Sequence, residues 1–156
     1  MTPAQLALVK AAIDADPALA AQPMNSDGAF AIAAALNLLA APAFIVWKTS
    51  VAISEIMSNG FRWTDVDGLT AGKARIWQWM TQLGTINPSK PNIRQGIRDC
   101  WGIGTAQETA ILPHLKRSAT RAEKLLATGT GSDASPALLT FEGELSYQDV
   151  EAARES

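Results

Sequence analysis

Hydrophobic residues recur every three or four positions over most of the first 128 residues, and this spacing predicts a series of helices. Together with capping residues at their starts, it predicts helices over residues 3–16, 26–41, 51–58, 71–83, 90–101 and 106–128. Capping boxes are expected at the first of these, from Thr2 and Gln5, and at the last, from Thr105 and Glu108. The longest helix contains Pro113, which should kink or split it. Asn59 and Gly60 are expected to end the third helix. The run Phe44–Trp47 fits a strand or a buried link between helices equally well.

The pattern changes after Gly129. Residues 129–136 have the Gly, Ser, Thr and Pro content of a linker. Leu138–Phe141 is the best strand candidate, and Ser146 can cap a terminal helix in which Leu145 and Val150 form a hydrophobic staple. The predicted fold is mainly α, with a compact helical bundle, residues 1–128, and a C-terminal arm, residues 129–156, that holds one short β-strand and the terminal helix. The bundle is expected to stay folded without this arm.

Charge is segregated along the chain, although the net charge is only −2. Residues 1–61 carry two basic and four acidic groups, residues 62–124 carry ten and five, and residues 125–156 carry one and six. A basic middle and an acidic tail attract each other, within one chain or between copies. The N-terminus lacks the pattern of a signal peptide, and no apolar run is long enough for a transmembrane helix, so no membrane partner is expected.

Residue types that carry catalysis or bind metals are scarce. His114 is the only histidine, and its place in a helix next to Pro113 fits a structural or exposed role. Cys100 is the only cysteine, which excludes an internal disulfide and a Cys-based zinc site, and a core thiol is expected there. We therefore expect no catalytic residues, no metal site and no cofactor, and the protein is not predicted to be an enzyme.

Two sets of basic residues recur at helical spacing. The first set shares one face of the helix at 90–101, and the second forms a basic face on the helix at 106–128. Both sets could contact nucleic-acid phosphates without reading sequence, or could hold the acidic arm. Their members are Lys90, Arg94, Arg98, Lys116, Arg117, Arg121 and Lys124.

Five tryptophans are many for a chain of 156 residues. Trp77, Trp101 and Trp47 fit apolar faces and are expected in the core. Ile76, Met80 and Leu83 are expected on the apolar face of Trp77, and Phe30 and Ile32 on the apolar face of the helix at 26–41. Trp79 lies about 200° around the helix from Trp77, so it should point outward as an interface anchor. The residues predicted to bind a partner are Trp79 and, in the arm, Leu138, Leu139, Phe141, Tyr147 and Val150.

Several segments resemble a family of short proteins encoded by tailed bacteriophages and prophages. The resemblance runs along most of the chain and is carried by Trp47-Lys48-Thr49, Ile86–Ser89, Arg121–Gly131 and Ser146–Val150. In size and helical content the chain is also similar to adaptor proteins of the phage head-to-tail connector, which form rings beneath the portal. The resemblance implies a structural virion protein, a connector adaptor that assembles as a homo-oligomeric ring on the portal or other head and tail proteins. It also implies location in the virion, and in the host cytoplasm during assembly. The alternative is a phage accessory protein that binds nucleic acid through its basic helical faces.

Overall fold

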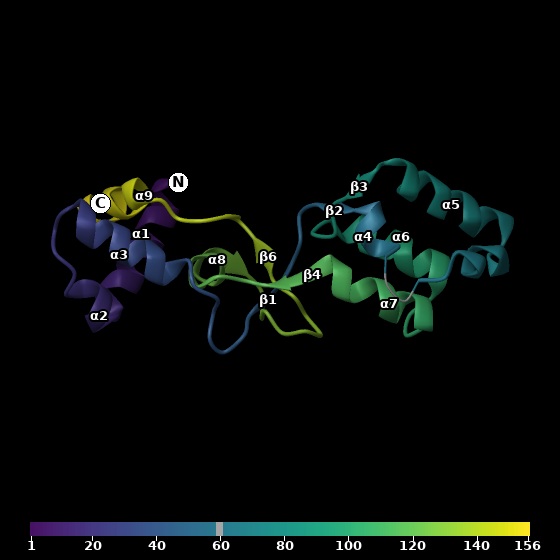
Figure 1. Ribbon diagram of the computed structural model, residues 1–156, viewed down its shortest axis with the longest axis horizontal. Coiled ribbons are helices and arrows are strands. Elements are labelled where there is room, and N and C mark those ends of the chain that lie inside the picture. The colour runs from purple at the N-terminus through teal and green to yellow at the C-terminus, as the bar shows by residue number, and fades with distance from the viewer. Residues whose placement is uncertain (59–60) are drawn as a thin grey trace. The chain divides into compact units, whose positions relative to one another are not determined.

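The computed structural model describes residues 1–58 and 61–156, and only the backbone of Trp63. The protein is mainly α, as the sequence predicts, and it also contains small two-stranded sheets. Its contacts divide the chain into two compact units (Figure 1). Unit 1 comprises Met1–Val46 and Ser118–Ser156, and unit 2 comprises Trp47–Arg117. The predicted boundary at residue 128 is not the one found, because residues 129–156 share a unit with the N-terminus.

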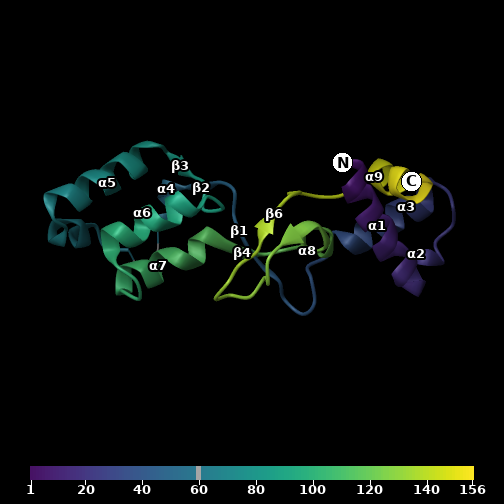
Figure 2. The same ribbon diagram turned by 180° about the vertical axis from the view of Figure 1, so that it is seen from behind.

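Unit 1 is built from both ends of the chain. Its elements are α1 (Pro3–Ala15), α2 (Pro17–Ala20), α3 (Ser26–Leu36), α8 (Arg121–Leu126), β5 (Ala127–Thr128), β6 (Leu138–Leu139) and α9 (Tyr147–Glu155). The terminal helix α9 packs against α1 and α3, and both chain ends lie beside these helices (Figures 1 and 2). Lys10 Nζ donates to the Ser156 carbonyl oxygen at 2.6 Å, which ties the C-terminus to α1.

Capping boxes fix three of the helix starts in unit 1. At α1 the pair is Thr2 and Gln5, at α8 it is Thr120 and Glu123, and at α9 it is Ser146 and Asp149. In each box the first side chain accepts the backbone N–H three residues on, and the second side chain accepts the N–H of the first residue. The predicted capping box of the first helix and the predicted Ser146 cap of the last helix are thus confirmed.

The core of unit 1 joins the two ends of the sequence. Val9, Ile13 and Leu36 are buried in the same cluster as Leu145 and Val150. The predicted staple residues Leu145 and Val150 therefore pack on α1 and α3. Removing apolar surface from water is the main favourable term in folding, so the C-terminal segment stabilises this unit.

The predicted linker, residues 129–136, is held by backbone hydrogen bonds. The Ile45 N–H donates to the Gly131 carbonyl oxygen at 2.7 Å, and the Ala137 N–H donates to the Ile45 carbonyl oxygen at 2.9 Å. β6 pairs with β5 in antiparallel register, with Thr128 opposite Leu138. The predicted strand is thus present as Leu138–Leu139, but its partner lies in the same unit, and the predicted free arm is wrong.

Unit 2 is a separate small helical body. Its elements are β2 (Val51–Ala52), α4 (Ile53–Ile56), the 3-10 helix η1 (Trp63–Gly68), α5 (Ala71–Gln82), β3 (Thr85–Ile86), α6 (Pro91–Trp101) and α7 (Ala106–Leu115). β2 pairs with β3, with Val51 opposite Ile86. Two further strands, β1 (Ile45–Trp47) and β4 (Lys116–Ser118), pair with each other and contain the points where the chain passes between units.

An aromatic cluster fills the core of unit 2. The ring of Phe61 stacks on that of Trp77 with centroids 5.5 Å apart, and both contact the Trp101 ring edge-on at 5.2 Å. Edge-to-face and offset-stacked rings are the favoured arrangements of aromatic side chains. The predicted burial of Trp47, Trp77 and Trp101 is confirmed.

Three predicted helices have clearly different bounds in the structure. The helix expected over residues 26–41 ends at Leu36. Residues 51–58 were expected to form one helix, but Val51 and Ala52 form β2 and the helix begins at Ile53. The expected stop at Asn59 and Gly60 lies outside the described residues. The predicted helix 106–128 is split, since α7 ends at Leu115, two residues after Pro113, and α8 begins at Arg121. This agrees with the expectation that the proline would split or kink the helix.

Candidate interaction surfaces

One face of α5 is apolar and open to solvent. Ile76, Trp79 and Leu83 lie within about 60° of one another around the helical axis. Trp79 is 61% exposed and Leu83 is 62% exposed, so the predicted outward direction of Trp79 is confirmed. The residues 71–82 of this helix include Lys73 and Arg75, both exposed, and no carboxylate. We call Ile76, Trp79 and Leu83 the α5 ridge.

The composition of the ridge differs from the sequence prediction. Ile76 and Leu83 were expected to share a buried face with Trp77 and Met80, but only Trp77 and Met80 are buried. The helix therefore turns a narrower apolar stripe inward than its sequence predicts, and the rest of its large apolar side chains form the ridge. Large apolar side chains gathered on a surface mark an interaction site more often than single ones do.

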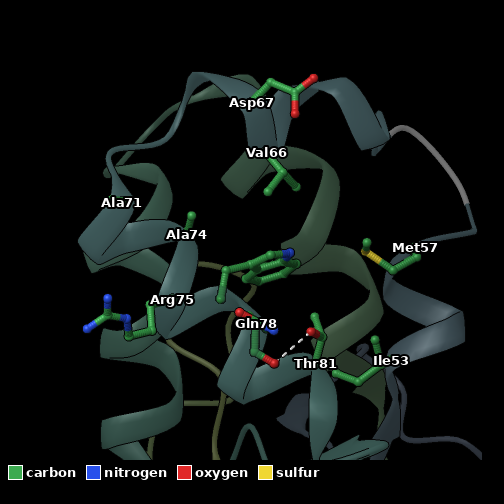
Figure 3. A pocket seen from close by; sticks show the side chains of 10 residues that line it. Ile53, Met57, Val66, Asp67, Ala71, Ala74, Arg75, Gln78 and Thr81 are labelled. Atoms are coloured by element: carbon green, nitrogen blue, oxygen red, sulfur yellow. Dashed lines mark hydrogen bonds between the residues drawn. The ribbon is translucent and has the colours of Figure 1, made fainter.

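A hollow of about 670 Å³ lies in unit 2 and is lined from α4, η1 and α5 (Figure 3). Its apolar lining residues are Ile53, Met57, Val66, Ala71, Ala74 and Trp77. Val66 and Met57 point into it, whereas Asp67 and Arg75 direct their charged groups away from its centre (Figure 3). Gln78 and Thr81 complete the lining. Walls that are mostly apolar suit an apolar side chain of a partner better than a polar small molecule.

A second hollow, of about 450 Å³, lies in unit 1 between α3 and the residues that lead into α9. The rings of Phe30 and Tyr147 stack in its wall with centroids 4.2 Å apart. Asn37 fixes the other wall, because its Nδ2 donates to the Leu145 carbonyl oxygen at 3.0 Å and its Oδ1 accepts the Leu145 N–H at 2.9 Å. We call this hollow the Phe30–Tyr147 groove.

The walls of the groove are acidic. Its largest exposed apolar residue is Phe30, whose exposure the sequence did not predict. Glu144 lines the groove and is exposed, and the residues 26–36 and 141–150 that form its walls include no Lys or Arg. Phe30 was expected in the core with Ile32, but it is 55% exposed. The two residues are about 200° apart on the helix, the same relation that separates Trp79 from Trp77, so helical geometry could have identified Phe30.

The predicted partner-binding residues of the C-terminal segment lie mostly within unit 1. Val150 is completely buried, so it is not available to a partner in this fold. Phe141 and Tyr147 pack against the core that contains Val150, and Leu139 packs against a smaller cluster around Val46. Leu138, at 38% exposed, is the one of these that presents a large part of its side chain to solvent. Most of the apolar area of Leu139, Phe141, Tyr147 and Val150 is thus used within unit 1, and only Tyr147 also lines the Phe30–Tyr147 groove.

The first predicted basic face consists of Lys90, Arg94 and Arg98, and the latter two make contacts within unit 2. Arg94 Nη1 donates to the carbonyl oxygens of Pro88 and Ser89, and its guanidinium lies 4.7 Å from the centre of the Trp47 ring. Burial, with a smaller contribution from Arg98, lowers the pKa of Arg94. Lys90 is exposed.

Arg98 belongs to a buried polar contact at the start of α7. Its Nε donates at 3.1 Å to Oε1 of Glu108, a carboxylate that is almost fully buried. Glu108 also accepts the Gly104 N–H through Oε2, while its own N–H donates to Thr105 Oγ1. The predicted capping box therefore shifts by one residue, with the carboxylate binding the Gly104 N–H.

The second predicted basic face does not exist as one helix face. Lys116 and Arg117 lie in β4, whereas Arg121 and Lys124 lie in α8. Arg121 Nη2 donates to Asp16 Oδ2 at 2.9 Å, and Lys124 Nζ lies 5.7 Å from the centre of the Phe44 ring. A continuous basic surface over residues 116–124 was predicted from a single long helix, and the split of that helix separates its members.

Cys100 lies in the core of unit 2, as predicted, and His114 is half-buried in α7. Cys100 is buried and its Sγ lies 3.5 Å from the Lys73 carbonyl oxygen. Burial, and then the nearby Asp99, raises the pKa of the Cys100 thiol, which keeps it protonated and a poor nucleophile. Within residues 1–58 and 61–156, no three His, Cys, Asp or Glu side chains gather as metal ligands.

The charge segregation of the sequence coincides with the two units. Unit 1 contains four basic and ten acidic residues, for a net charge of −6, and unit 2 contains nine basic and five acidic residues, for a net charge of +4. The α5 ridge thus lies on a unit of positive net charge, and the Phe30–Tyr147 groove lies on a unit of negative net charge.

No family model, curated protein or solved structure matches this chain. Among the helices that the structure describes, none combines the length and apolar character needed to cross a membrane.

Proposed function

We propose that this protein is a non-enzymatic structural protein of a tailed-phage particle, an adaptor of the head-to-tail connector that assembles as a ring on the portal. The observation that carries the proposal is the outward Trp79, which lies on the α5 ridge with two other exposed apolar side chains. Tryptophan is among the residues that contribute most to protein–protein interfaces. The resemblance of Arg121–Gly131 and Ser146–Val150 to phage and prophage proteins supports a virion as the site of assembly.

The proposal does not use a C-terminal arm. A ring of identical subunits needs two different surfaces on each copy, which meet in a heterologous contact that repeats until it closes. The α5 ridge and the Phe30–Tyr147 groove are two such surfaces, on units of opposite net charge. Such a protein would be found in the host cytoplasm before assembly and in the particle afterwards.

Particles of the encoding phage or prophage test this proposal. Mass spectrometry of purified particles should find the protein alongside portal and tail proteins, and electron microscopy of the purified protein mixed with portal rings should show added density beneath the portal. The Trp79→Ser variant should be depleted from these particles although it folds, because it lacks the proposed interface anchor. Absence of the wild-type protein from intact particles contradicts the proposal.

A second candidate function is nonspecific binding of nucleic acid by unit 2. Its net charge of +4 favours this, and the exposed Lys73, Arg75 and Lys90 are its candidate phosphate contacts. A gel-shift series with duplex DNA should then show binding that weakens steeply as salt rises from about 50 to 200 mM. Absence of a shift at the lowest salt concentration removes this candidate.

A further inference from the structure

We propose that the α5 ridge of one copy docks into the Phe30–Tyr147 groove of a second copy, so that the chains join head to tail. This inference rests on the proposed function, because it names the contact through which the subunits would assemble. The occupant of the groove is a second copy of this chain, and three relations between the two surfaces lead to it.

The first relation is one of shape. The ridge projects a tryptophan and two aliphatic side chains from a helix, while the groove is a hollow of about 450 Å³ with an aromatic wall. An indole ring that enters the groove can stack against the Phe30 ring, whose exposed half has no other cover in unit 1. Such a contact would bury large apolar side chains that the isolated chain leaves in water.

The second relation is one of charge. The helix that carries the ridge holds Lys73 and Arg75 and no carboxylate. The lining of the groove includes Glu144 and no cation, and Asp27 lies on α3 one turn before Phe30. Both pairs are exposed, so they would lie at the rim of the contact. Charges at a rim guide association and reject wrong partners more than they add affinity.

The third relation concerns symmetry. The ridge and the groove are different surfaces, so a contact between them cannot be a two-fold self-contact. Each copy that docks its ridge still offers a free groove, and the assembly grows until it closes as a ring or continues as a filament. A nucleic acid, by contrast, would be repelled from a groove whose walls hold carboxylates and no cation.

Full-length protein and two single-surface variants provide the test. Trp79→Ala removes the ridge, and Ala34→Arg fills the groove from an exposed position in its lining without touching the core. Ile103→Ala is the matched control, since Ile103 is 79% exposed but belongs to neither surface. Sedimentation velocity over a concentration series at low and high salt would measure association, and far-UV circular dichroism would verify that each variant is folded.

We expect the wild-type protein and Ile103→Ala to form larger species as concentration rises, more readily at low salt. Each surface variant should weaken association by about thirtyfold or more, the size expected for an interface hot spot. A mixture of the two variants should form a 1:1 dimer and nothing larger, because the intact ridge of Ala34→Arg fits only the intact groove of Trp79→Ala.

Two results would overturn the inference. One is a wild-type protein that stays monomeric across the concentration series, and the other is a pair of folded variants that associate like the wild type or fail to form the mixed dimer. The particle test separates this inference from the proposed function. If the protein is monomeric in solution but present in virions, the docking inference is wrong and the proposed function stands. If the protein self-associates but is absent from virions, the proposed function is wrong and the docking inference stands.

Discussion

The ring of Tyr147, the first residue of α9, stacks on the ring of Phe30 in α3 with the two planes inclined by 29°. Sequence places these residues more than a hundred positions apart. Their contact, together with the buried Leu145 just before it, joins the C-terminal segment to the N-terminal helices. The C-terminal residues consequently contribute to the stability of unit 1 as well as forming one wall of the proposed docking groove.

Leu145→Ala should lower the free energy of unfolding of unit 1 by about 2–5 kcal/mol, the usual range for truncating a buried leucine. Leu145 is almost fully buried in the cluster that includes Ile13 and Leu36. All five tryptophans lie in unit 2. Urea unfolding followed by tryptophan fluorescence therefore reports unit 2, and far-UV circular dichroism reports both units, so the loss should appear only in the dichroism.

Leu138→Ala is the matched control for this measurement. Leu138 lies in the same C-terminal segment but exposes over a third of its side chain. Its truncation should cost less than about 1 kcal/mol, as expected for a surface substitution. Equal losses for the two variants would contradict the assignment of Leu145 to the core, and no loss for either would restore the sequence-based expectation of a dispensable arm.

Local signals in the sequence predicted local structure well. The capping box at Thr2 and the cap at Ser146 are confirmed because each depends on residues three positions apart. The role of residues 129–156 could not be predicted in the same way. A Gly- and Ser-rich segment has the same composition whether it is a linker or a tight turn, and the Ile45 contact that holds Gly131 lies far away in sequence.

The candidate surfaces were predicted in part. Trp79 was identified because helical geometry separates it from Trp77, whereas Phe30 was assigned to the core although the same geometry separates it from Ile32. The basic faces were overestimated for a different reason. Arg98 and Arg121 have the spacing of surface residues, but their partners Glu108 and Asp16 are supplied by tertiary contacts and a helix boundary that no periodic pattern contains.

Gly131→Ala should lower the free energy of unfolding of unit 1 by about 2–5 kcal/mol, because backbone strain and overpacking act together. Gly131 has φ of +66°, and a Cβ atom there would lie 2.1 Å from Cε2 of the Phe44 ring. Far-UV circular dichroism during urea unfolding would measure the loss.

Gly104→Ala separates the two causes. Gly104 has a similar φ of +73°, but a Cβ atom there would meet nothing within 4 Å. This variant should cost only the backbone strain, about 1–2 kcal/mol, and the loss should appear in tryptophan fluorescence because Gly104 lies in unit 2. A loss at Gly131 no larger than that at Gly104 would show that the Phe44 ring does not pack over the glycine.

The ion pair between Asp16 and Arg121 should make unit 1 sensitive to acid. The hydrogen bond from Arg121, supported by the Ala18 N–H, lowers the pKa of Asp16 from its ordinary value of 3.8. The unfolded chain then binds the proton more readily than the folded chain does. The stabilisation is present above the unfolded pKa and is lost as the pH falls through the lower folded pKa.

Asp16→Asn should therefore reduce stability at pH 6 and leave a smaller further loss between pH 6 and pH 3 than the wild type shows. Urea midpoints followed by far-UV circular dichroism at the two pH values would measure this. Asp14→Asn is the control, since Asp14 is an exposed carboxylate near the end of α1, two residues before Asp16. An unchanged acid response in Asp16→Asn would show that this carboxylate is not the group that titrates.

The Cys100 thiol should react slowly with iodoacetamide in the folded protein. Burial excludes the reagent, and the raised pKa of the thiol lowers the fraction of reactive thiolate at any pH near neutrality. Mass spectrometry after timed alkylation at pH 8 should show a lower rate in buffer than in concentrated urea, because burial and the raised pKa both slow the reaction of the folded protein. Because the chain has one cysteine, the modified mass reports a single site in the core of unit 2. Equal rates in buffer and in urea would mean that α6 does not hold Cys100 against α5, and the packing that supports the α5 ridge would have to be redrawn.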